Sequence, residues 1–316
     1  MSASAPGAIV MSGATRGIGL EAARTLLREE ADARIIVLAR PGRRAWLEEL
    51  GPAASRVAAV DADLASIRSL REAAAATRRL LDGAPIEALV LNGGAQFATA
   101  LETTPDGLER TFAVNVLAPH LLLEELAPLV RPGGRSIVTV SDTHFGDLRH
   151  NLGMVPGPRW RDPAELARPG AFERPGSVAA GRTAYSTSKL AAIHLVRERA
   201  RRHPEQAPVL SWNPGFVPAT GLAREAGPLS RLAMRWLMPA LAATPLATLP
   251  ARAGRVLADA ARGRPAAPSG AYLDRDRVAE SSPESHDPAR EARLWTVLRE
   301  LADGGGARHE GPADRP

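Results

Sequence analysis

Short apolar runs alternate with amphipathic stretches along most of the chain. Residues 34–39 (R-I-I-V-L-A) form a nearly continuous apolar run, which is typical of a strand buried on both faces of a parallel sheet. Between such runs, apolar residues recur with the period of a helix. The pattern predicts strands at residues 8–11, 34–39, 57–60, 86–91, 136–140, 208–212 and 271–273. It predicts helices at 18–30, 66–81, 108–130 (kinked near Pro119), 183–202, 251–261 and 288–302.

This order of elements predicts one Rossmann-type α/β domain over residues 1–302. We expect a doubly wound, mostly parallel, seven-stranded sheet with helices on both faces. Residues 144–181, rich in Pro, Gly and Arg, and residues 219–250, apolar and interrupted by Pro, do not fit the alternation. We expect both segments to be insertions at the carboxyl ends of strands, where such sheets bind ligands. The Gly- and Pro-rich tail, residues 303–316, is predicted to be disordered.

The composition narrows the class of protein. With 45% apolar and 24% charged residues among its 316, the chain is expected to be globular. The lack of cysteine excludes disulfides and cysteine nucleophiles, and it fits a reducing, cytoplasmic location. We find no apolar run long enough to predict a membrane span and no signal-peptide pattern. The seven histidines lack metal-ligand spacing, so no metal site is predicted.

The net charge of +5 does not by itself indicate a nucleic-acid partner. The basic residues are arginines scattered among acids, with Lys189 as the single lysine. No basic stripe with interleaved aromatic residues is present in the sequence. We therefore expect a small-molecule substrate and no nucleic acid.

A glycine-rich turn follows the first predicted strand. Residues 12–19 read S-G-A-T-R-G-I-G, and a predicted helix begins within them. Glycines allow the backbone to approach a pyrophosphate, and the helix N-terminus offers it free N–H groups. A plain capped turn is the alternative. The predicted cofactor contacts here are Gly13, Thr15, Arg16, Gly17, Ile18 and Gly19.

The G-x-x-x-G-x-G spacing of this turn resembles the short-chain dehydrogenase/reductase family. Later positions match the family's motifs in order and cover nearly the whole chain. They are Asp63-Leu64, Asn92-Gly93-Gly94-Ala95, Asn115, Ser141, the Y-x-x-x-K motif of Tyr185 and Lys189, and Pro214-Gly215. The resemblance implies cofactor contacts at Asp63, Leu64, Asn92, Gly93, Gly94, Tyr185, Lys189, Pro214, Gly215, Val217 and Thr220. Since members of this family are often dimers or tetramers, it is also compatible with a homo-oligomer.

Tyr185 and Lys189 are four residues apart on a predicted helix, so they share one face. A phenol has an ordinary pKa of about 10, and a nearby ammonium lowers the pKa by favouring the phenolate. The pair therefore makes sense as a proton donor and the group that tunes it. Ser141 can hydrogen-bond a substrate oxygen, and the resemblance implies that Asn115 holds a water that relays protons. A single lysine in an arginine-rich chain also favours a role that arginine would not serve.

The basic residues near the second predicted strand indicate which cofactor is used. NAD enzymes of this architecture carry an acid at the end of that strand, where this chain has Arg40. Arg16, Arg43 and Arg44 are also expected within reach, and converging guanidinium groups suit a 2′-phosphate. The sequence therefore predicts NADP(H) in preference to NAD(H), the alternative being chance placement in an arginine-rich chain.

Ser141 and Tyr185 are 44 residues apart, a spacing that resembles the branch with retinol dehydrogenase-like enzymes and light-dependent protochlorophyllide reductases. Residues 220–225 (T-G-L-A-R-E) are also similar to that branch. The chain departs from it in lacking cysteines and in having Ala219, followed by Thr220, where the family's P-G-x-V-x-T threonine would fall.

The apolar segment 219–250 predicts a lid over a roomy pocket for a bulky, largely apolar substrate. The predicted reaction is hydride transfer between NADPH and a carbonyl or alcohol group. Two alternatives stay open at this point: reduction of a conjugated C=C bond, and a non-catalytic NADPH-binding regulator or scaffold.

Overall fold

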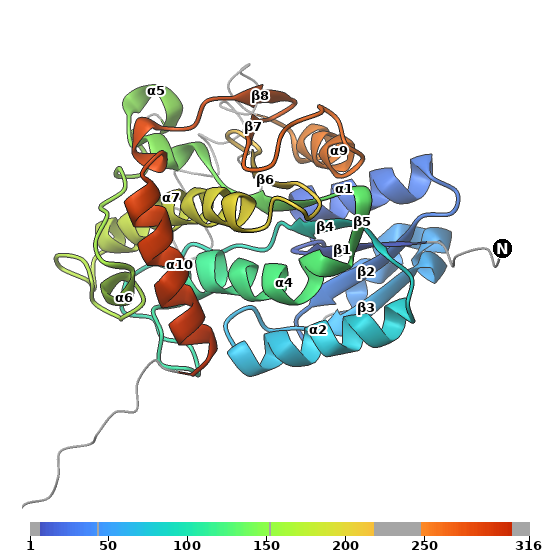
Figure 1. Cartoon of the computed structure of the whole chain (residues 1–316), viewed down its shortest axis with the longest axis horizontal. Coiled ribbons are helices and arrows are strands. Elements are labelled where there is room, and N and C mark those ends of the chain that lie inside the picture. Colours follow the sequence, from blue (N-terminus) through green and yellow to red (C-terminus); the bar gives the residue numbers. More distant parts are fainter. Residues whose placement is uncertain (1–6, 43, 152, 218–247, 305–316) are drawn as a thin grey trace, which may run out of the picture.

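The chain folds around one sheet with helices on both faces (Figure 1). The computed structural model describes residues 7–42, 44–151, 153–217 and 248–304. Strand order is β3-β2-β1-β4-β5-β6-β7-β8, and every neighbouring pair is parallel except β7 and β8. The strands are β1 Ala8–Ser12, β2 Arg34–Ala39, β3 Val57–Asp61, β4 Ile86–Leu91, β5 Val130–Thr139, β6 Val209–Asn213, β7 Tyr272–Asp274 and β8 Arg277–Ala279.

The predicted fold class is confirmed, but the predicted count of seven strands is wrong. The eighth strand, β8, closes a short antiparallel hairpin with β7. It has three residues, of which Arg277 and Val278 are exposed, so it carries no alternation that a sequence pattern could reveal.

The longer helices are α1 Gly17–Glu29, α2 Ile67–Leu81, α4 Ala118–Leu126, α7 Val178–Arg202, α9 Pro250–Ala261 and α10 Pro288–Ala302. The shorter ones are α3 Arg110–Phe112, α5 Leu148–Asn151, α6 Pro163–Leu166, the π-turn η2 Ala113–Leu117, and the 3₁₀ segments η1 Ala45–Arg56, η3 Ala127–Leu129, η4 Asp142–Phe145 and η5 Pro283–Ser285. Helices α5 and α6 lie in the predicted insertion 144–181. Most of segment 219–250 and of the tail 303–316 lies outside the described residues.

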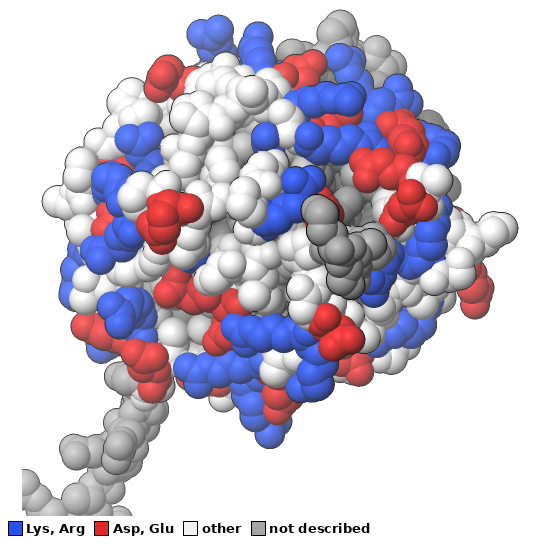
Figure 2. All heavy atoms as spheres, turned by 45° about the vertical axis from the view of Figure 1, so that its right-hand side comes forward, with Lys and Arg blue, Asp and Glu red and all other residues white. Residues whose placement is uncertain are grey.

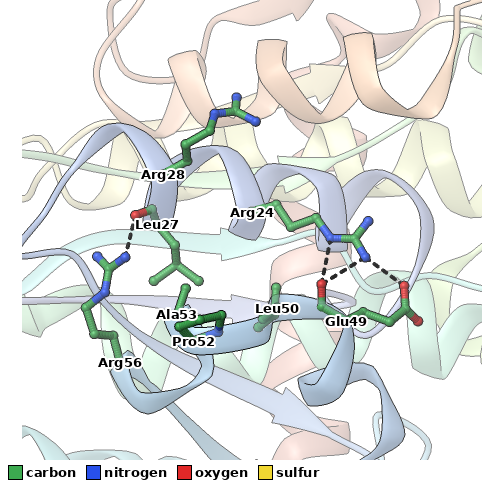
Figure 3. Close-up of a pocket in the computed structure, with 8 residues that line it drawn as sticks. All are labelled: Arg24, Leu27, Arg28, Glu49, Leu50, Pro52, Ala53 and Arg56. Atoms are coloured by element: carbon green, nitrogen blue, oxygen red, sulfur yellow. Dashed lines mark hydrogen bonds and ion pairs between the residues drawn. The ribbon is translucent and has the colours of Figure 1, made fainter.

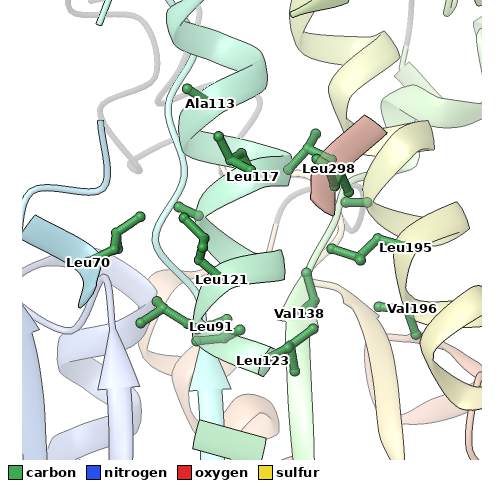
Figure 4. Packing of buried hydrophobic residues seen from close by; sticks show 14 of the residues in the cluster. Leu70, Leu91, Ala113, Leu117, Leu121, Leu123, Val138, Leu195, Val196 and Leu298 are labelled. Atoms are coloured by element: carbon green, nitrogen blue, oxygen red, sulfur yellow. The ribbon is translucent and has the colours of Figure 1, made fainter. Parts of the chain in front are cut away.

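Two hydrophobic cores lie on opposite faces of the sheet. Along β1, Val10 joins one core, whereas Ile9 and Met11 join the other, as alternating side chains of a strand must. The first core contains residues of α2, α4, α7 and α10, and the second contains residues of α1 and α9. Figure 4 shows the first core, where Leu91 and Val138 from the sheet face leucines of the helices.

Two helices differ from the predictions for local reasons. Helix α7 begins five residues before the predicted start at 183, because the Ser177 side chain accepts a hydrogen bond from the backbone of Ala180 and caps it there. The long helix predicted at 108–130 extends from Arg110 to Leu129 and is irregular, not broken: the π-turn η2 interrupts its α-helical hydrogen bonding two residues before Pro119. The missed segment η1 contains Gly51 and Pro52, which interrupt any helical period.

One described helical stretch, Arg110–Leu129, has the length and mean hydropathy of a membrane span. No span is predicted from the sequence, because no apolar run in it reaches the length that a membrane span needs. Of its most apolar window, 78% is buried inside the protein. Length and composition alone are weak evidence, and this burial is that of a core helix.

The surface carries mixed charge. On the face in Figure 2, basic and acidic side chains are interspersed. Elsewhere in the described structure such charges form ion pairs, for example Arg24 with Glu49 and Arg78 with Glu125. This face offers no continuous basic surface for a phosphate backbone.

Helix α10 is fastened to α7 through a buried carboxylate. Glu291 is fully buried, accepts a hydrogen bond from Arg197 at 3.0 Å, and pairs with Arg201. Its oxygen lies 3.8 Å from the Nδ1 atom of His194, too far for a hydrogen bond. Burial raises the pKa of Glu291, but His194 and the guanidinium groups of Arg201 and Arg197 together lower it more, so the net shift is downward.

We expect Glu291→Gln to lower the free energy of unfolding by about 1–2 kcal/mol at pH 7, since a charge-assisted pair is lost. Because the folded pKa of Glu291 is depressed, its stabilisation exists above the ordinary carboxylate pKa and is lost as the pH falls through the folded value. The two proteins should therefore converge in acid. Urea unfolding from pH 7 to pH 3 measures this, with exposed Glu300→Gln on the same helix as the control. A difference that is constant with pH would contradict the prediction.

Candidate active site

The turns after β1 and β4 are tied together at the carboxyl edge of the sheet. The amide Nδ2 of Asn92 donates to the carbonyl oxygen of Gly13 at 3.0 Å, and the backbone N–H of Gly93 donates to Ser12 Oγ at 3.1 Å. A Cβ added at Gly13 would lie 2.6 Å from the backbone nitrogen of Gly93. Glycine is therefore required here, both for this close approach and for the positive φ of Gly13.

The start of α1 fits a dinucleotide pyrophosphate. A Cβ added at Gly19 would lie 2.1 Å from the oxygen of Gly13, whereas one added at Gly17 would meet nothing within 4 Å. The side chain of Arg16, the N-cap residue, makes no capping hydrogen bond. The first N–H groups of α1 thus face an open side of the turn, as phosphate binding requires. Thr15 and Ile18 lie in the same turn, half-buried and buried respectively.

Asn115 and Lys189 meet the backbone that follows β4. A Cβ added at Gly94 would lie 3.1 Å from Asn115 Oδ1 and 3.2 Å from Lys189 Nζ. Asn115 holds Ala95 through both backbone groups, accepting from its N–H at 2.9 Å and donating to its carbonyl at 2.8 Å. It also donates to Ser188 Oγ at 2.9 Å. Its amide is therefore committed to shaping this turn.

The carbonyl of Asn115 lies in the π-turn η2. In a regular α-helix it would accept from the residue four positions later, but that residue is Pro119, which has no N–H. The kink predicted near Pro119 thus coincides with a backbone carbonyl relieved of its usual donor. This gives the expected water-holding role of Asn115 a physical basis in its backbone rather than its side chain.

Tyr185, Ser141 and Lys189 come together at the carboxyl end of β5. Tyr185 and Lys189 are both buried on α7, and the Ser141 side chain lies near enough to the Tyr185 hydroxyl to influence its pKa. Lys189 Nζ donates to the carbonyl oxygen of Thr139 at 3.0 Å and lies 5.6 Å from the centre of the Tyr185 ring. The structure therefore brings all four predicted catalytic residues to one place.

Burial dominates the ionisation of the pair. It raises the pKa of Tyr185 to about 12, a shift that the Ser141 hydrogen bond opposes and the negative charge of Asp142 adds to. Burial also lowers the pKa of Lys189 to about 8. From the sequence, Lys189 is expected to lower the pKa of Tyr185, but Lys189 is not among the groups that shift this pKa in the structure. The ammonium lies beside the ring and is directed to Thr139, not to the phenol oxygen.

The residues predicted for the adenosine end lie along neighbouring strand ends. Leu64 packs on Gly93: a Cβ added at Gly93 would lie 2.5 Å from the Cδ1 atom of Leu64. Asp63 accepts from the backbone of Ala65 at 3.0 Å, which fixes the turn after β3. Arg16 and Arg40 are both exposed, at the start of α1 and the end of β2.

The predicted contribution of Arg43 and Arg44 to a phosphate site receives no support. The guanidinium of Arg44 pairs with Asp61 at the end of β3, so its charge is already partly neutralised. Arg43 lies outside the described residues.

The loop after β6 is described only in part. Gly215 has a φ of +73°, and its backbone N–H donates to Asn213 Oδ1 at 3.1 Å. Pro214 precedes it, and Val217 is buried. Thr220 and residues 218–247, which hold most of the predicted lid, lie outside the described residues.

Three polar residues of the site, Thr139, Asp142 and Asn213, are not among the site residues predicted from the sequence motifs. Thr139 receives Lys189, as above, and its own hydroxyl donates to Asn92 Oδ1 at 3.1 Å. Asn213 Oδ1 accepts the backbone N–H of Asp142 at 3.1 Å as well as that of Gly215. The sequence signal for Thr139 and Asn213 is a polar residue near the end of an apolar strand, and that for Asp142 is its place beside Ser141.

A groove of about 600 Å³ lies elsewhere, between α1 and η1 (Figure 3). Its floor is apolar, and arginines stand around it. Arg24 is engaged by Glu49, and Arg56 donates to backbone carbonyls, including that of Leu27. These bonds attach η1 to α1, so we assign the groove to packing and not to catalysis.

Comparison with known proteins agrees with this site. A family model described as short chain dehydrogenase matches residues 7–147. The chain belongs to the short-chain dehydrogenase/reductase family, a class of oxidoreductases that bind a nicotinamide cofactor.

Its relatives include protochlorophyllide reductases and a ketoreductase. The chain is 29% identical to protochlorophyllide reductase A from Oryza sativa subsp. japonica over 326 residues, covering 93% of this chain and 80% of that protein. It is 35% identical over 215 residues to a protein of Streptomyces sp. (strain C5) provisionally named daunorubicin C-13 ketoreductase DnrU, covering 66% of this chain and 65% of that one. The chain is similar in fold to the NADPH-bound carbonyl reductase from chicken fatty liver, with a TM-score of 0.58 and 18% identity over 89% of this chain and 97% of that chain.

Proposed function

We propose that this protein reduces the carbonyl group of a bulky, largely apolar small molecule with NADPH. The observation that carries the proposal is the placement of Ser141 and Tyr185 together, with Lys189 beside the Tyr185 ring, where the glycine-lined turns meet. The nicotinamide, when bound, supplies the hydride. Gly13, Gly17 and Gly19 would leave room for its pyrophosphate.

The side chains then divide the remaining work. Ser141 orients the carbonyl oxygen, and Tyr185 donates the proton that this oxygen needs once hydride has been added. The ammonium group of Lys189 places a positive charge beside the Tyr185 ring. The carbonyls of Thr139 and Asn115 lie on the route by which the proton is replaced, the first bonded to Lys189 and the second relieved of its helical donor.

The proposed substrate class rests on the relatives and on the mouth of the site. The names of the two relatives refer to large ring systems, and residues 219–250 are rich in leucine and include two methionines and one tryptophan. Among the described residues, Phe145 and His150 stack with ring centres 3.8 Å apart, a few residues beyond Ser141. A flat apolar molecule would find complementary surface there.

The proposed preference for NADPH rests on Arg16 and Arg40. Both side chains are exposed near the carboxyl edge of the sheet. The residue that follows β2 is Arg40, where an NAD-dependent enzyme of this architecture would have an acid. Two guanidinium groups suit a 2′-phosphate, whereas an acid there would repel it.

We expect Arg40→Asp to shift the ratio of NADPH to NADH affinity toward NADH by about tenfold, the effect of losing one charge-assisted contact. Titration of each cofactor, followed by protein fluorescence, measures the ratio. Arg34→Asp makes the same change at the opposite end of β2 and should leave the ratio as it was. An unchanged ratio in Arg40→Asp would remove this residue from the cofactor site.

The proposed function is tested by the same titration of the unaltered protein, followed by a panel of bulky ketones, aldehydes and enones. Tight NADPH binding, weak NADH binding and alcohol products would support it. Reduction of the C=C bond of the enones would replace the proposed reaction. Absence of binding to either cofactor would leave a scaffold role instead.

A further inference from the structure

The side chain of Asn213 joins three segments that meet at the carboxyl end of β6. Asn213 is the last residue of this strand and is buried. Its Oδ1 atom accepts the backbone N–H of Asp142, after β5, and that of Gly215, after β6, each at 3.1 Å. Its Nδ2 atom donates to Asp274 Oδ1 on β7, also at 3.1 Å. One amide therefore connects the ends of three neighbouring strands.

The partners leave this amide a single orientation. Its oxygen has two lone pairs, and the two backbone N–H groups occupy them. If the amide were turned over, its NH₂ group would face those two donors, and its oxygen would face the carboxylate of Asp274. Asp274 is itself held by Arg275 at 3.3 Å and by Arg277 at 3.2 Å. The hairpin of β7 and β8 therefore fixes the acceptor atom of Asn213 in place.

The amide continues the connection between β5 and β6 past their last backbone bond. The backbone N–H of Val140 donates to the carbonyl oxygen of Trp212 at 2.8 Å. Since the N–H of every second residue of a strand faces the same neighbour, the next one in this series belongs to Asp142. It donates to the side chain of Asn213 instead. The two loops thus stay joined at the carboxyl edge, where sheets of this kind bind their ligands.

These two loops are the ones that would meet substrate and cofactor. Asp142 directly follows Ser141, which orients the carbonyl oxygen in the proposed function. Because β1, β4, β5 and β6 are neighbours in that order, a dinucleotide that reaches from the turns after β1 and β4 to Ser141 ends beside the loop of Gly215. Gly215 is also confined from outside, since a Cβ added there would lie 2.6 Å from Arg275 Nε. A shift of Asn213 would therefore move substrate and cofactor relative to each other.

We propose that Asn213 is a positioning residue for hydride transfer, which holds the Ser141 loop and the loop after β6 at the separation where the carbonyl carbon meets the nicotinamide. This inference rests on the proposed function. Asn213 acts through the backbone of Asp142 and Gly215, and not by contact with the reacting atoms. Such positioning matters because a displacement of the reacting groups by about 1 Å can lower a rate about 100-fold.

The first test removes the amide and retains a side chain of similar size. We expect Asn213→Leu to lower the rate of hydride transfer by about 100-fold. The rate is measured in single turnovers, from the loss of NADPH absorbance with a saturating ketone that the unaltered protein reduces. NADPH affinity should change by a few fold at most, because the pyrophosphate is expected at the distant turn of Gly13 and Gly19. Asn213→Ser, whose hydroxyl is too short to reach the same partners, should give the same result and replaces Asn213→Leu if that variant does not fold.

Asn151 provides a matched control. It is also buried, its Oδ1 accepts the backbone N–H of Gly153, and its Nδ2 donates to the carbonyl oxygen of Val155, each at 2.9 Å. Asn151→Leu therefore removes the same kinds of hydrogen bond from another loop. It should lower the temperature of thermal unfolding and leave the single-turnover rate as it was. If Asn213→Leu did the same, Asn213 would have a structural role only, and the proposal would be wrong.

A reversed pair tests the acceptor atom itself. Asn213→Asp combined with Asp274→Asn keeps an oxygen for both backbone N–H groups and restores the bond between the two side chains in the opposite direction. The total charge of the cluster stays the same. This double variant should transfer hydride within a few fold of the unaltered protein. A rate as low as that of Asn213→Leu would overturn the proposal.

Hydrogen exchange separates this inference from the proposed function, because it needs no turnover. The backbone N–H groups of Asp142 and Gly215 should exchange about tenfold faster in Asn213→Leu and near the original rate in the double variant. If Tyr185→Phe retained the reduction rate, the proposed function itself would fail. If exchange rose in Asn213→Leu while the hydride-transfer rate stayed unchanged, only the positioning role would fail.

Discussion

Tyr185→Phe is expected to lower kcat for carbonyl reduction by about 10²- to 10⁴-fold, because the proton donor is removed while the ring that fills the site is retained. Tyr185 is buried, so the change deletes one polar atom and leaves the packing of the ring. NADPH affinity should change by a few fold at most. Steady-state rates and a fluorescence titration measure the two quantities separately.

Tyr272→Phe is the matched control for this variant. It makes the same chemical change at the only other tyrosine, which is buried on β7. Its hydroxyl makes no hydrogen bond to a described residue, so the rate and the stability should both be retained. A Tyr185→Phe variant as active as this control would contradict the proposed mechanism.

Gly19→Ala is expected to weaken NADPH binding on the order of 100-fold, against the direction of helix propensity. Alanine is favoured over glycine inside a helix by about 1 kcal/mol. The added methyl, however, would lie 2.1 Å from the carbonyl oxygen of Gly13 and 2.8 Å from the amide of Asn92. The turn would have to open, and overpacking of this kind costs about 1–3 kcal/mol.

Gly42→Ala serves as the comparison for this second variant. Gly42 has a positive φ, but an added methyl there would meet nothing within 4 Å. The variant should therefore lose some stability through backbone strain and keep its affinity for NADPH. Thermal unfolding and NADPH titration of both variants give the comparison. Equal losses of NADPH affinity in the two variants would show that the close packing of Gly19 against Gly13 and Asn92 is not needed for cofactor binding.

Most of the sheet was predictable from the sequence because its central strands are buried on both faces. Within the run 34–39, residues 35–39 are buried and all apolar, and the run became β2 with the predicted bounds. The edge hairpin of β7 and β8 follows no such rule. Its exposed residues Arg277 and Val278 carry no pattern, and its pairing is set by the chain folding back.

The site was predictable as a set of residues but not as an arrangement of hydrogen bonds. Fixed spacings place Tyr185 and Lys189 on one face of α7, and motif order places Ser141 near them. The partner of each polar atom depends on distant elements. Asn213, more than seventy residues from Asp142, holds the turn that presents Asp142 to Ser141. Burial, which raises the pKa of Tyr185, likewise depends on the packing of distant elements, and neither spacing nor composition carries it.

The attachment of α10 to α7 bears on how the protein is made. The apolar face of α7 is covered by Leu294 and Leu298, which are synthesised about a hundred residues after the catalytic tyrosine. On the ribosome, the helix that carries Tyr185 and Lys189 therefore emerges with this face uncovered and waits for its cover. Until residues 288–302 leave the exit tunnel, the nascent chain presents a hydrophobic surface of the kind that chaperones bind.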